Sequence, residues 1–225
     1  MDQLEQSYFI EKYIEYRDKF SAENLSLIEC PIISVNNKQL GHGQCIPDAI
    51  VNKNDSCQWI ELTTFSRNQL MARRIREMIK YPEHFEGQRI ILGIPPREFD
   101  SLIVGFHEAI RKKVSKDYSR FAHLSNTNLQ GTLLVIFVNE DHFFDEIEYY
   151  QFINAVKDEH ILFSWGVATG QFDQIILGAN VLINGQWVST FEPIVNREKM
   201  VHLRKRQQIK ENMLLNLAKQ TIEIN

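Results

Sequence analysis

The chain has 225 residues, of which 44% are hydrophobic, and its 25 basic and 29 acidic residues give a formal net charge of −4. This length allows one substantial core, so we expect a single domain over 1–225, with a core at 1–167 and a C-terminal hairpin and helix at 168–225. The excess of acidic residues excludes a protein that coats nucleic acid along its whole surface.

The N-terminal segment predicts a helix and lacks the pattern of a secretory signal. Aromatic residues recur at helical spacing over 2–20, at Phe9, Tyr13, Tyr16 and Phe20, as in an amphipathic helix. The first residues lack the basic and then apolar order of a secretory signal, and no run of about twenty apolar residues occurs. We therefore expect a cytoplasmic protein with no membrane partner.

A β-hairpin is predicted in the first half of the chain. Residues 46–51 and 59–65 are rich in Ile, Val, Trp, Thr and Phe, and residues 52–56 between them have turn composition. A further strand is predicted at 27–35, and the strand that ends at residue 51 extends back to residue 39 with glycine interruptions.

Two carboxylates fall at matching positions of this hairpin. Asp48 lies on its first strand and Glu61 on its second, so the two can face one another across the ladder. Because strand side chains alternate between faces, Glu61 and Thr63 are expected on one face, while Ile60 and Leu62 point into a core. Hard cations take oxygen ligands, often one or two carboxylates, so the pair predicts a site for Mg²⁺ or Mn²⁺.

Helices and strands alternate over the rest of the core. Ser66 and Gln69 form a capping box that begins a helix ending before Pro82. Further helices are predicted at 97–121 and 144–158, and further strands at 89–94, 132–138 and 161–167. This alternation predicts an α/β fold with a mixed central sheet and helices on both faces.

The end of the chain predicts a hairpin and a long helix. Asn184-Gly185 separates strands at 174–183 and 186–194, which indicates an antiparallel hairpin at the sheet edge or a flap. The terminal helix at 197–222 has apolar residues at helical spacing, so a homodimer through this helix is one interpretation of it.

Positive charge is concentrated on two predicted helices. Residues 66–80 carry five cations and one acidic residue, and residues 197–210 carry six cations and one acidic residue. Such faces predict contacts with the phosphates of DNA, and solvated helix faces without a ligand explain them equally well.

The cysteines do not predict a zinc site. His42, Cys45 and Cys57 could in principle hold zinc, but these residues and Cys30 lack paired metal-ligand spacing. Free thiols and a loop histidine are the favoured interpretation.

The hairpin motif resembles that of the PD-(D/E)XK nuclease superfamily. Pro47, Asp48 and Glu61 match the Pro-Asp of one strand and the acidic residue of the next, and Thr63 stands where the motif has lysine. The resemblance implies a restriction-endonuclease-like core and a metal-dependent DNA endonuclease of restriction, repair or mobile-element processing. It also implies Mg²⁺ or Mn²⁺ held by Asp48, Glu61 and the backbone carbonyl of Leu62.

Three further residues are candidates for completing this site. The Thr63 hydroxyl can hydrogen-bond a water but brings no positive charge. Arg67, in the first turn of the next predicted helix, is the preferred substitute cation, and an ion pair of Arg67 with Glu61 without any metal is given equal weight. The family often adds a carboxylate from the first helix, where Glu5 lies nearest the apolar stripe.

Two other classes of function stay open. A nuclease-fold module that has lost its chemistry would bind DNA or a protein partner, and Thr63 favours that alternative. An unrelated α/β protein would carry Asp48 and Glu61 as ordinary surface carboxylates.

Overall fold

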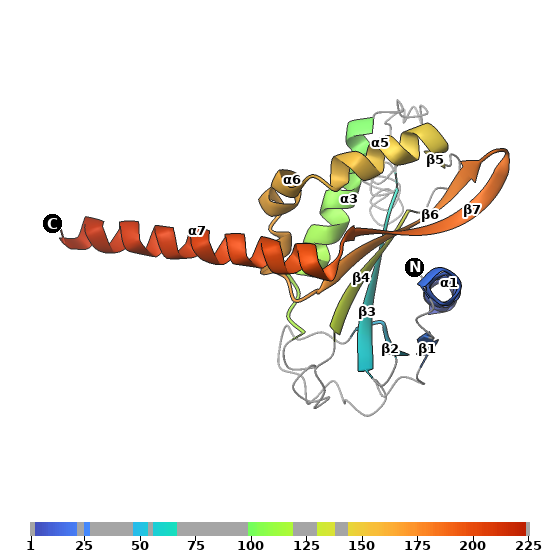
Figure 1. Cartoon of the computed structure of the whole chain (residues 1–225), viewed down its shortest axis with the longest axis horizontal. Coiled ribbons are helices and arrows are strands. Elements are labelled where there is room, and N and C mark those ends of the chain that lie inside the picture. Colours follow the sequence, from blue (N-terminus) through green and yellow to red (C-terminus); the bar gives the residue numbers. More distant parts are fainter. Residues whose placement is uncertain are drawn as a thin grey trace, which may run out of the picture.

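The computed structural model describes residues 3–21, 25–27, 47–53, 56–66, 99–118, 130–137 and 144–223. In these residues, seven strands form one mixed sheet with helices on both faces (Figure 1). The predicted α/β class with a mixed, helix-covered sheet is therefore confirmed. None of the described helices combines the length and the apolar character needed to span a bilayer.

The first half of the described chain contains two helices and four strands. In order, these are α1 (Gln3–Ser21), β1 (Leu25–Leu27), β2 (Ala49–Lys53), β3 (Ser56–Phe65), α3 (Phe99–Val114) and β4 (Gln130–Phe137). Strand β2 is antiparallel to β1 and β3, whereas β3 is parallel to β4.

The second half adds a short strand, a hairpin and further helices. In order, these are β5 (Phe144–Asp145), α5 (Glu146–Val156), α6 (Glu159–Ser164), a 3-10 turn (Val167–Thr169), β6 (Gln174–Ile183), β7 (Gln186–Val195) and α7 (Arg197–Glu223). Strand β6 is parallel to β4 and β5 and antiparallel to β7. The predicted C-terminal hairpin thus continues the central sheet through β6.

The sheet separates two cores. On one face, α3, α5, α6 and the start of α7 bury side chains such as Phe106, Phe152 and Leu203. On the other face, α1 packs Ile10 and Tyr13 onto the sheet. Side chains of successive strand residues go to opposite faces, as expected for a sheet covered on both sides.

One turn and one close strand contact depend on glycine. Asn184 and Gly185 both have positive φ, 49° and 76°, as a tight two-residue hairpin turn requires. At the other end of the sheet, Gly131 lies opposite Trp59 in the register. A Cβ atom at Gly131 would lie 2.3 Å from the indole ring, so glycine is needed for this close approach.

The structure corrects three predicted elements. The helix predicted at 97–121 is shorter, because α3 ends at Val114. The strand predicted at 161–167 is wrong, because this segment continues α6 into the 3-10 turn. Asp158 caps α6 by accepting hydrogen bonds from the backbone N–H groups of His160 and Ile161, at 2.8 and 3.0 Å. The helix predicted at 144–158 begins instead as strand β5, and its helical part is α5.

Several predictions fall outside the described residues. These are the helix that begins at Ser66, with Arg67 and Gln69, the strand at 89–94, most of the strand at 27–35, and His42 and Cys45.

Candidate active site

The two carboxylates of the motif lie together on the face of the sheet that α3 covers. The register pairs Ala49 with Ile60, so Asp48, one residue before β2, is level with Glu61 of β3. Glu61 shares its face with Trp59 and is only 1% exposed. The expected alternation is confirmed, since Ile60 packs in the core of the opposite face.

Glu61 is neutralised by lysines from the C-terminal end of α3. Lys113 Nζ donates a hydrogen bond to Glu61 Oε1 and forms an ion pair with it. Lys116, just beyond the helix, places its Nζ 3.1 Å from the same oxygen. A buried carboxylate needs such partners, because removing an unpaired charge from water is costly.

Aromatic packing holds the segment that carries Lys116. Tyr118 is buried, and its ring centroid lies 4.8 Å from that of Trp59, two residues before Glu61. The Tyr118 backbone N–H donates to Gln171 Oε1 at 2.9 Å. Lys116 is thereby fixed over the strand that it contacts.

Asp48 is held by the backbone of the strand opposite. Its Oδ2 accepts a hydrogen bond from the Leu62 N–H at 2.7 Å. Burial, and then repulsion from Glu61, raises the pKa of Asp48, while the Leu62 N–H, Lys113 and Lys116 act in the opposite direction. Two carboxylates so placed favour a bound cation, because a cation offsets both unfavourable effects.

One carboxylate oxygen of Asp48 and Glu61 has no hydrogen-bond donor among the described residues. Among the described residues, Glu61 Oε2 is buried and accepts no hydrogen bond, whereas Oε1 accepts from both lysines. A buried, unsatisfied acceptor requires an explanation such as an ion or a water. The described residues contain no group of three or more His, Cys, Asp and Glu suited to a metal. Asp48 and Glu61 would offer a metal two carboxylates, and Mg²⁺ is commonly bound through one or two carboxylates together with water.

The structure describes the other predicted site residues to different extents. Thr63 is half-buried on β3, two residues beyond Glu61. Leu62 buries its side chain in the opposite core, and its backbone contacts Asp48. Glu5 lies within α1, and the structure describes the course of that helix but not the Glu5 side chain. The preferred cation, Arg67, lies outside the described residues, and among the described residues Lys113 and Lys116 contact Glu61.

Sequence reasoning missed the two lysines. Leu102, Phe106 and Ala109 form the buried stripe of α3, and Lys113 occupies the next position of that stripe at a step of four residues. A cation that continues an apolar stripe indicates a buried acidic partner, because a lysine is rarely buried unpaired. This signal was present in the sequence, but it does not identify the partner.

Searches of family models, curated proteins and solved structures give no match to the chain.

Proposed function

We propose that this chain is a metal-dependent DNA endonuclease with a restriction-endonuclease-like core. The element order supports this fold, since α1 precedes an antiparallel hairpin with the two carboxylates, and α3 leads to a strand parallel to β3. The helix that begins at Ser66 and the strand at 89–94, which follow the motif directly, lie outside the described residues.

The observation that carries the proposal is the convergence of two carboxylates and two lysines. Asp48 and Glu61 come from paired strands, and Lys113 and Lys116 come from the end of the helix above them. One lysine would already neutralise Glu61, and here two lysines contact the same oxygen. Two lysines on one oxygen, beside a second carboxylate with a raised pKa, is an arrangement more typical of functional sites.

Each residue has a role in this mechanism. Asp48 and Glu61 Oε2 would hold Mg²⁺ or Mn²⁺ with the Leu62 carbonyl, and the bound metal would supply a Lewis acid and an acidified water. Lys113 and Lys116 would supply the positive charge that the Thr63 position lacks. Their ammonium groups would stabilise the charge that develops on an attacked phosphate.

Exposed cations near this site would hold the DNA backbone. Arg111 and Lys112 are exposed in the last turn of α3. Glu61, Leu133, Ile175 and Val195 form one row across the sheet. With strands about 4.8 Å apart, the end of β7 is about 14 Å from Glu61.

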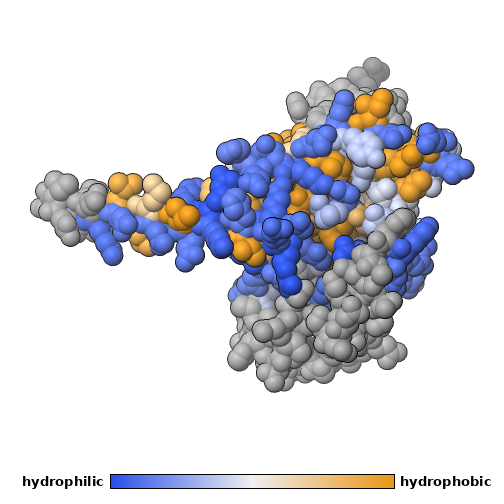
Figure 2. All heavy atoms as spheres, in the orientation of Figure 1, coloured by the Kyte–Doolittle hydropathy of each residue, from blue (hydrophilic) through white to orange (hydrophobic). Residues whose placement is uncertain are grey.

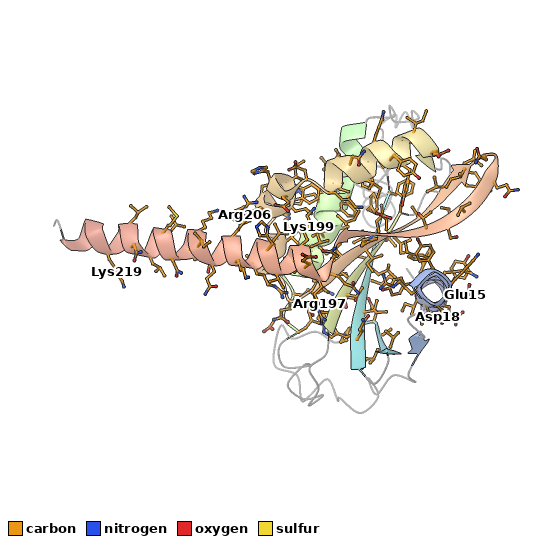
Figure 3. The ribbon with its side chains drawn as sticks, in the orientation of Figure 1. Glu15, Asp18, Arg197, Lys199, Arg206 and Lys219 are labelled. Atoms are coloured by element: carbon orange, nitrogen blue, oxygen red, sulfur yellow. The ribbon has the colours of Figure 1, made fainter. Side chains whose placement is uncertain are left out.

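Helix α7 adds its own cations at the end of that row. It begins two residues after the row ends, and Arg197 lies at its start, next to the body (Figure 3). Arg197 and Lys205 are exposed. These cations and those of α3 are therefore suited to contact phosphates near the carboxylates and toward one end of the row.

A second candidate function is a DNA- or protein-binding module without catalysis. Thr63 in place of the motif lysine favours it, and so does the direct ion pair between Lys113 and Glu61, which neutralises the carboxylate without a metal. In this case the site would be a structural relic and the exposed cations would carry the function.

Cleavage of a labelled DNA duplex in Mg²⁺ or Mn²⁺ tests the proposal. We expect Asp48→Asn and Glu61→Gln each to lower the rate at least about 10²-fold, and Lys113→Met to do so because it removes a charge-stabilising group. Lys219→Met, an exposed lysine near the end of α7, and Glu15→Gln, an exposed carboxylate of α1, serve as controls and should retain the rate.

The outcomes separate the two functions. Metal-dependent cleavage that survives both carboxylate substitutions would reject this site. Absence of cleavage, with Mn²⁺ binding that is lost in Asp48→Asn by calorimetry, would retain the metal site and reject the enzyme. DNA binding without either metal binding or cleavage would favour the non-catalytic module.

A further inference from the structure

The segment between the 3-10 turn and β6 packs against two parts of the candidate active site. We call its residues 170–173 the brace. The Phe172 ring of the brace is buried, and its centroid lies 5.0 Å from that of Trp59 and 5.7 Å from that of Tyr118. Trp59 lies on β3 two residues before the buried carboxylate, and Tyr118 lies two residues after the second lysine. The brace therefore contacts both the strand and the segment that form the site.

Gln171 of the brace holds the segment that carries Lys116. Its Oε1 accepts a hydrogen bond from the Tyr118 backbone N–H at 2.9 Å, and its Nε2 donates one to Asp117 Oδ1 at 3.0 Å. A single carboxamide thus contacts both residues that follow Lys116, whose ammonium lies 3.1 Å from Glu61 Oε1. Because a carboxamide offers a donor and an acceptor at once, glutamine suits this double contact.

The two lysines of the site are placed by different means. Lys113 lies within α3, so the helix itself sets the position of its backbone. Lys116 comes after the end of α3; its backbone N–H donates to the Lys113 carbonyl at 3.1 Å, and the chain then leaves the helical path. The course of residues 117–118 consequently decides where the Lys116 side chain starts. A change in that course should affect Lys116 more than Lys113.

The brace is itself attached to β4 and α7. The Asp173 backbone N–H donates to the Gly131 carbonyl at 2.7 Å, and Asp173 Oδ2 accepts from the Gly131 N–H at 2.9 Å. Arg204 of α7 contacts Asp173 Oδ1 and two carbonyls of the brace. Hydrophilic residues gather where α7 meets the body (Figure 2). These contacts fix the backbone from which the Gln171 side chain extends.

We propose that Gln171 is a positioning residue, which keeps the Lys116 ammonium on the buried carboxylate by holding residues 117 and 118. This role deepens the proposed function and rests on it, because Lys116 would there stabilise the charge on an attacked phosphate. A cation that is already in place contributes more to such stabilisation than one that must be moved during the reaction. Loss of the Gln171 contacts should loosen Lys116 without displacing Lys113.

A loss variant and an exchange variant test this role. Gln171→Ala removes both hydrogen bonds and introduces no charge. Gln171→Glu combined with Asp117→Asn exchanges the donor and the acceptor, so the new amide can donate to the new carboxylate. The exchange retains both side-chain lengths and the net charge, and it should restore what Gln171→Ala loses. Gln208→Ala, at an exposed glutamine of α7, is the matched control.

The labelling rate of each lysine reports how it is held. Acylation by a water-soluble amine reagent, followed by mass spectrometry of peptides, measures this rate for Lys113 and Lys116 in the same sample. An ammonium that is hydrogen-bonded to a carboxylate is shielded from the reagent. We expect Gln171→Ala to raise the rate at Lys116 at least about 3-fold, as the loss of a hydrogen bond predicts, and to leave Lys113 unchanged.

The exchange variant and Gln208→Ala should label at the wild-type rate, and unchanged thermal unfolding would show that all the variants stay folded. Three outcomes would overturn the role of Gln171. These are an unchanged rate at Lys116 in Gln171→Ala, an equal rise at Lys113, and an exchange variant that labels as Gln171→Ala does.

Cleavage kinetics separate this role from the proposed function. A wild type that does not cleave DNA would reject the proposed function, while labelling would still decide how Lys116 is held. In a chain that cleaves, Gln171→Ala should lower kcat at least about 3-fold with KM nearly unchanged, because the lysine acts in the transition state. In Lys116→Met, the added Gln171→Ala should have no further effect, since Gln171 acts through Lys116. An undiminished further loss of rate there would overturn the role.

Discussion

At the scale of single residues, Glu61 depends on its lysines for stability as well as function. Lys113→Met leaves the buried carboxylate with Lys116 alone, so we expect the free energy of unfolding to fall by about 2 kcal/mol. Glu61→Gln in the same chain should recover most of this loss, because it removes the charge that needs a partner. Urea denaturation of the two single variants and the double variant measures the coupling. Equal losses of unfolding free energy for Lys113→Met and the exposed Lys112→Met would contradict the dependence of Glu61 on Lys113.

Asp48 makes the free energy of unfolding depend on pH. Its pKa in the folded chain lies above the ordinary value of 3.8 because of burial and then the charge of Glu61. The folded state thus binds this proton more tightly than the unfolded state does. The resulting stabilisation is fully present below pH 3.8 and is lost as the pH rises through the folded pKa.

In metal-free buffer at pH 7, Asp48→Asn should therefore stabilise the protein, by about 0.5–2 kcal/mol. The asparagine carbonyl can still accept the Leu62 hydrogen bond. The advantage should shrink in acid, where the wild-type carboxyl is protonated, and Mg²⁺ should stabilise the wild type alone. Denaturation curves at pH 7 and pH 4, with and without Mg²⁺, provide the measurement. A variant less stable than the wild type at pH 7 would count against this electrostatic account.

At the scale of elements, a helix or strand was predicted correctly where the local sequence favours one structure only. The β6–β7 hairpin was predictable because Asn184-Gly185 tolerates the positive φ angles that its turn needs. Residues 161–167 were predicted wrongly because a short apolar run does not distinguish a strand from a buried helix. The N-cap at Asp158 favours a helix at this position, and α6 begins directly after it.

The site was only half predictable for a related reason. Asp48 and Glu61 are neighbours through a local hairpin, so strand spacing alone brings them together. Lys113 and Lys116 reach Glu61 across 52 and 55 residues of chain. Their contact comes from the way α3 packs on the sheet, which local sequence patterns do not encode.

Arg204 shows that a basic segment on a helix is not uniform. Its guanidinium contacts Asp173 Oδ1 at 3.2 Å and the carbonyls of Gly170 and Phe172 at 3.2 and 2.7 Å. Asp173 also accepts the Gly131 N–H at 2.9 Å. Arg204 therefore ties α7 to the segment before β6, and its charge is already engaged within the body.

Arg204→Ala should lower the free energy of unfolding by about 1–3 kcal/mol, because it leaves partly buried acceptors unpaired. The neighbouring Lys205→Ala should change it by no more than about 0.5 kcal/mol, as an exposed position with no described contact does. Thermal or urea unfolding compares the two. If Arg204→Ala left the free energy of unfolding unchanged, these contacts would add nothing to the attachment of α7.

At the scale of the whole molecule, the engaged and exposed cations predict different effects on DNA binding. Arg197→Ala with Lys205→Ala should weaken binding and flatten its dependence on salt, by about 0.9 in the log-log slope for each phosphate that is no longer neutralised. Lys219→Ala, on the projecting part of α7, should leave both unchanged. Fluorescence anisotropy over a range of salt concentrations measures the slope. A salt-independent affinity would reject binding to the phosphate backbone.

The length of α7 also sets how far the chain reaches beyond its body. Residues 208–219 are all exposed, and at 1.5 Å per residue these twelve residues extend about 18 Å along the helix axis (Figure 1). None of them belongs to the candidate active site. The reach of the helix and the chemistry of the site can therefore be changed independently of one another.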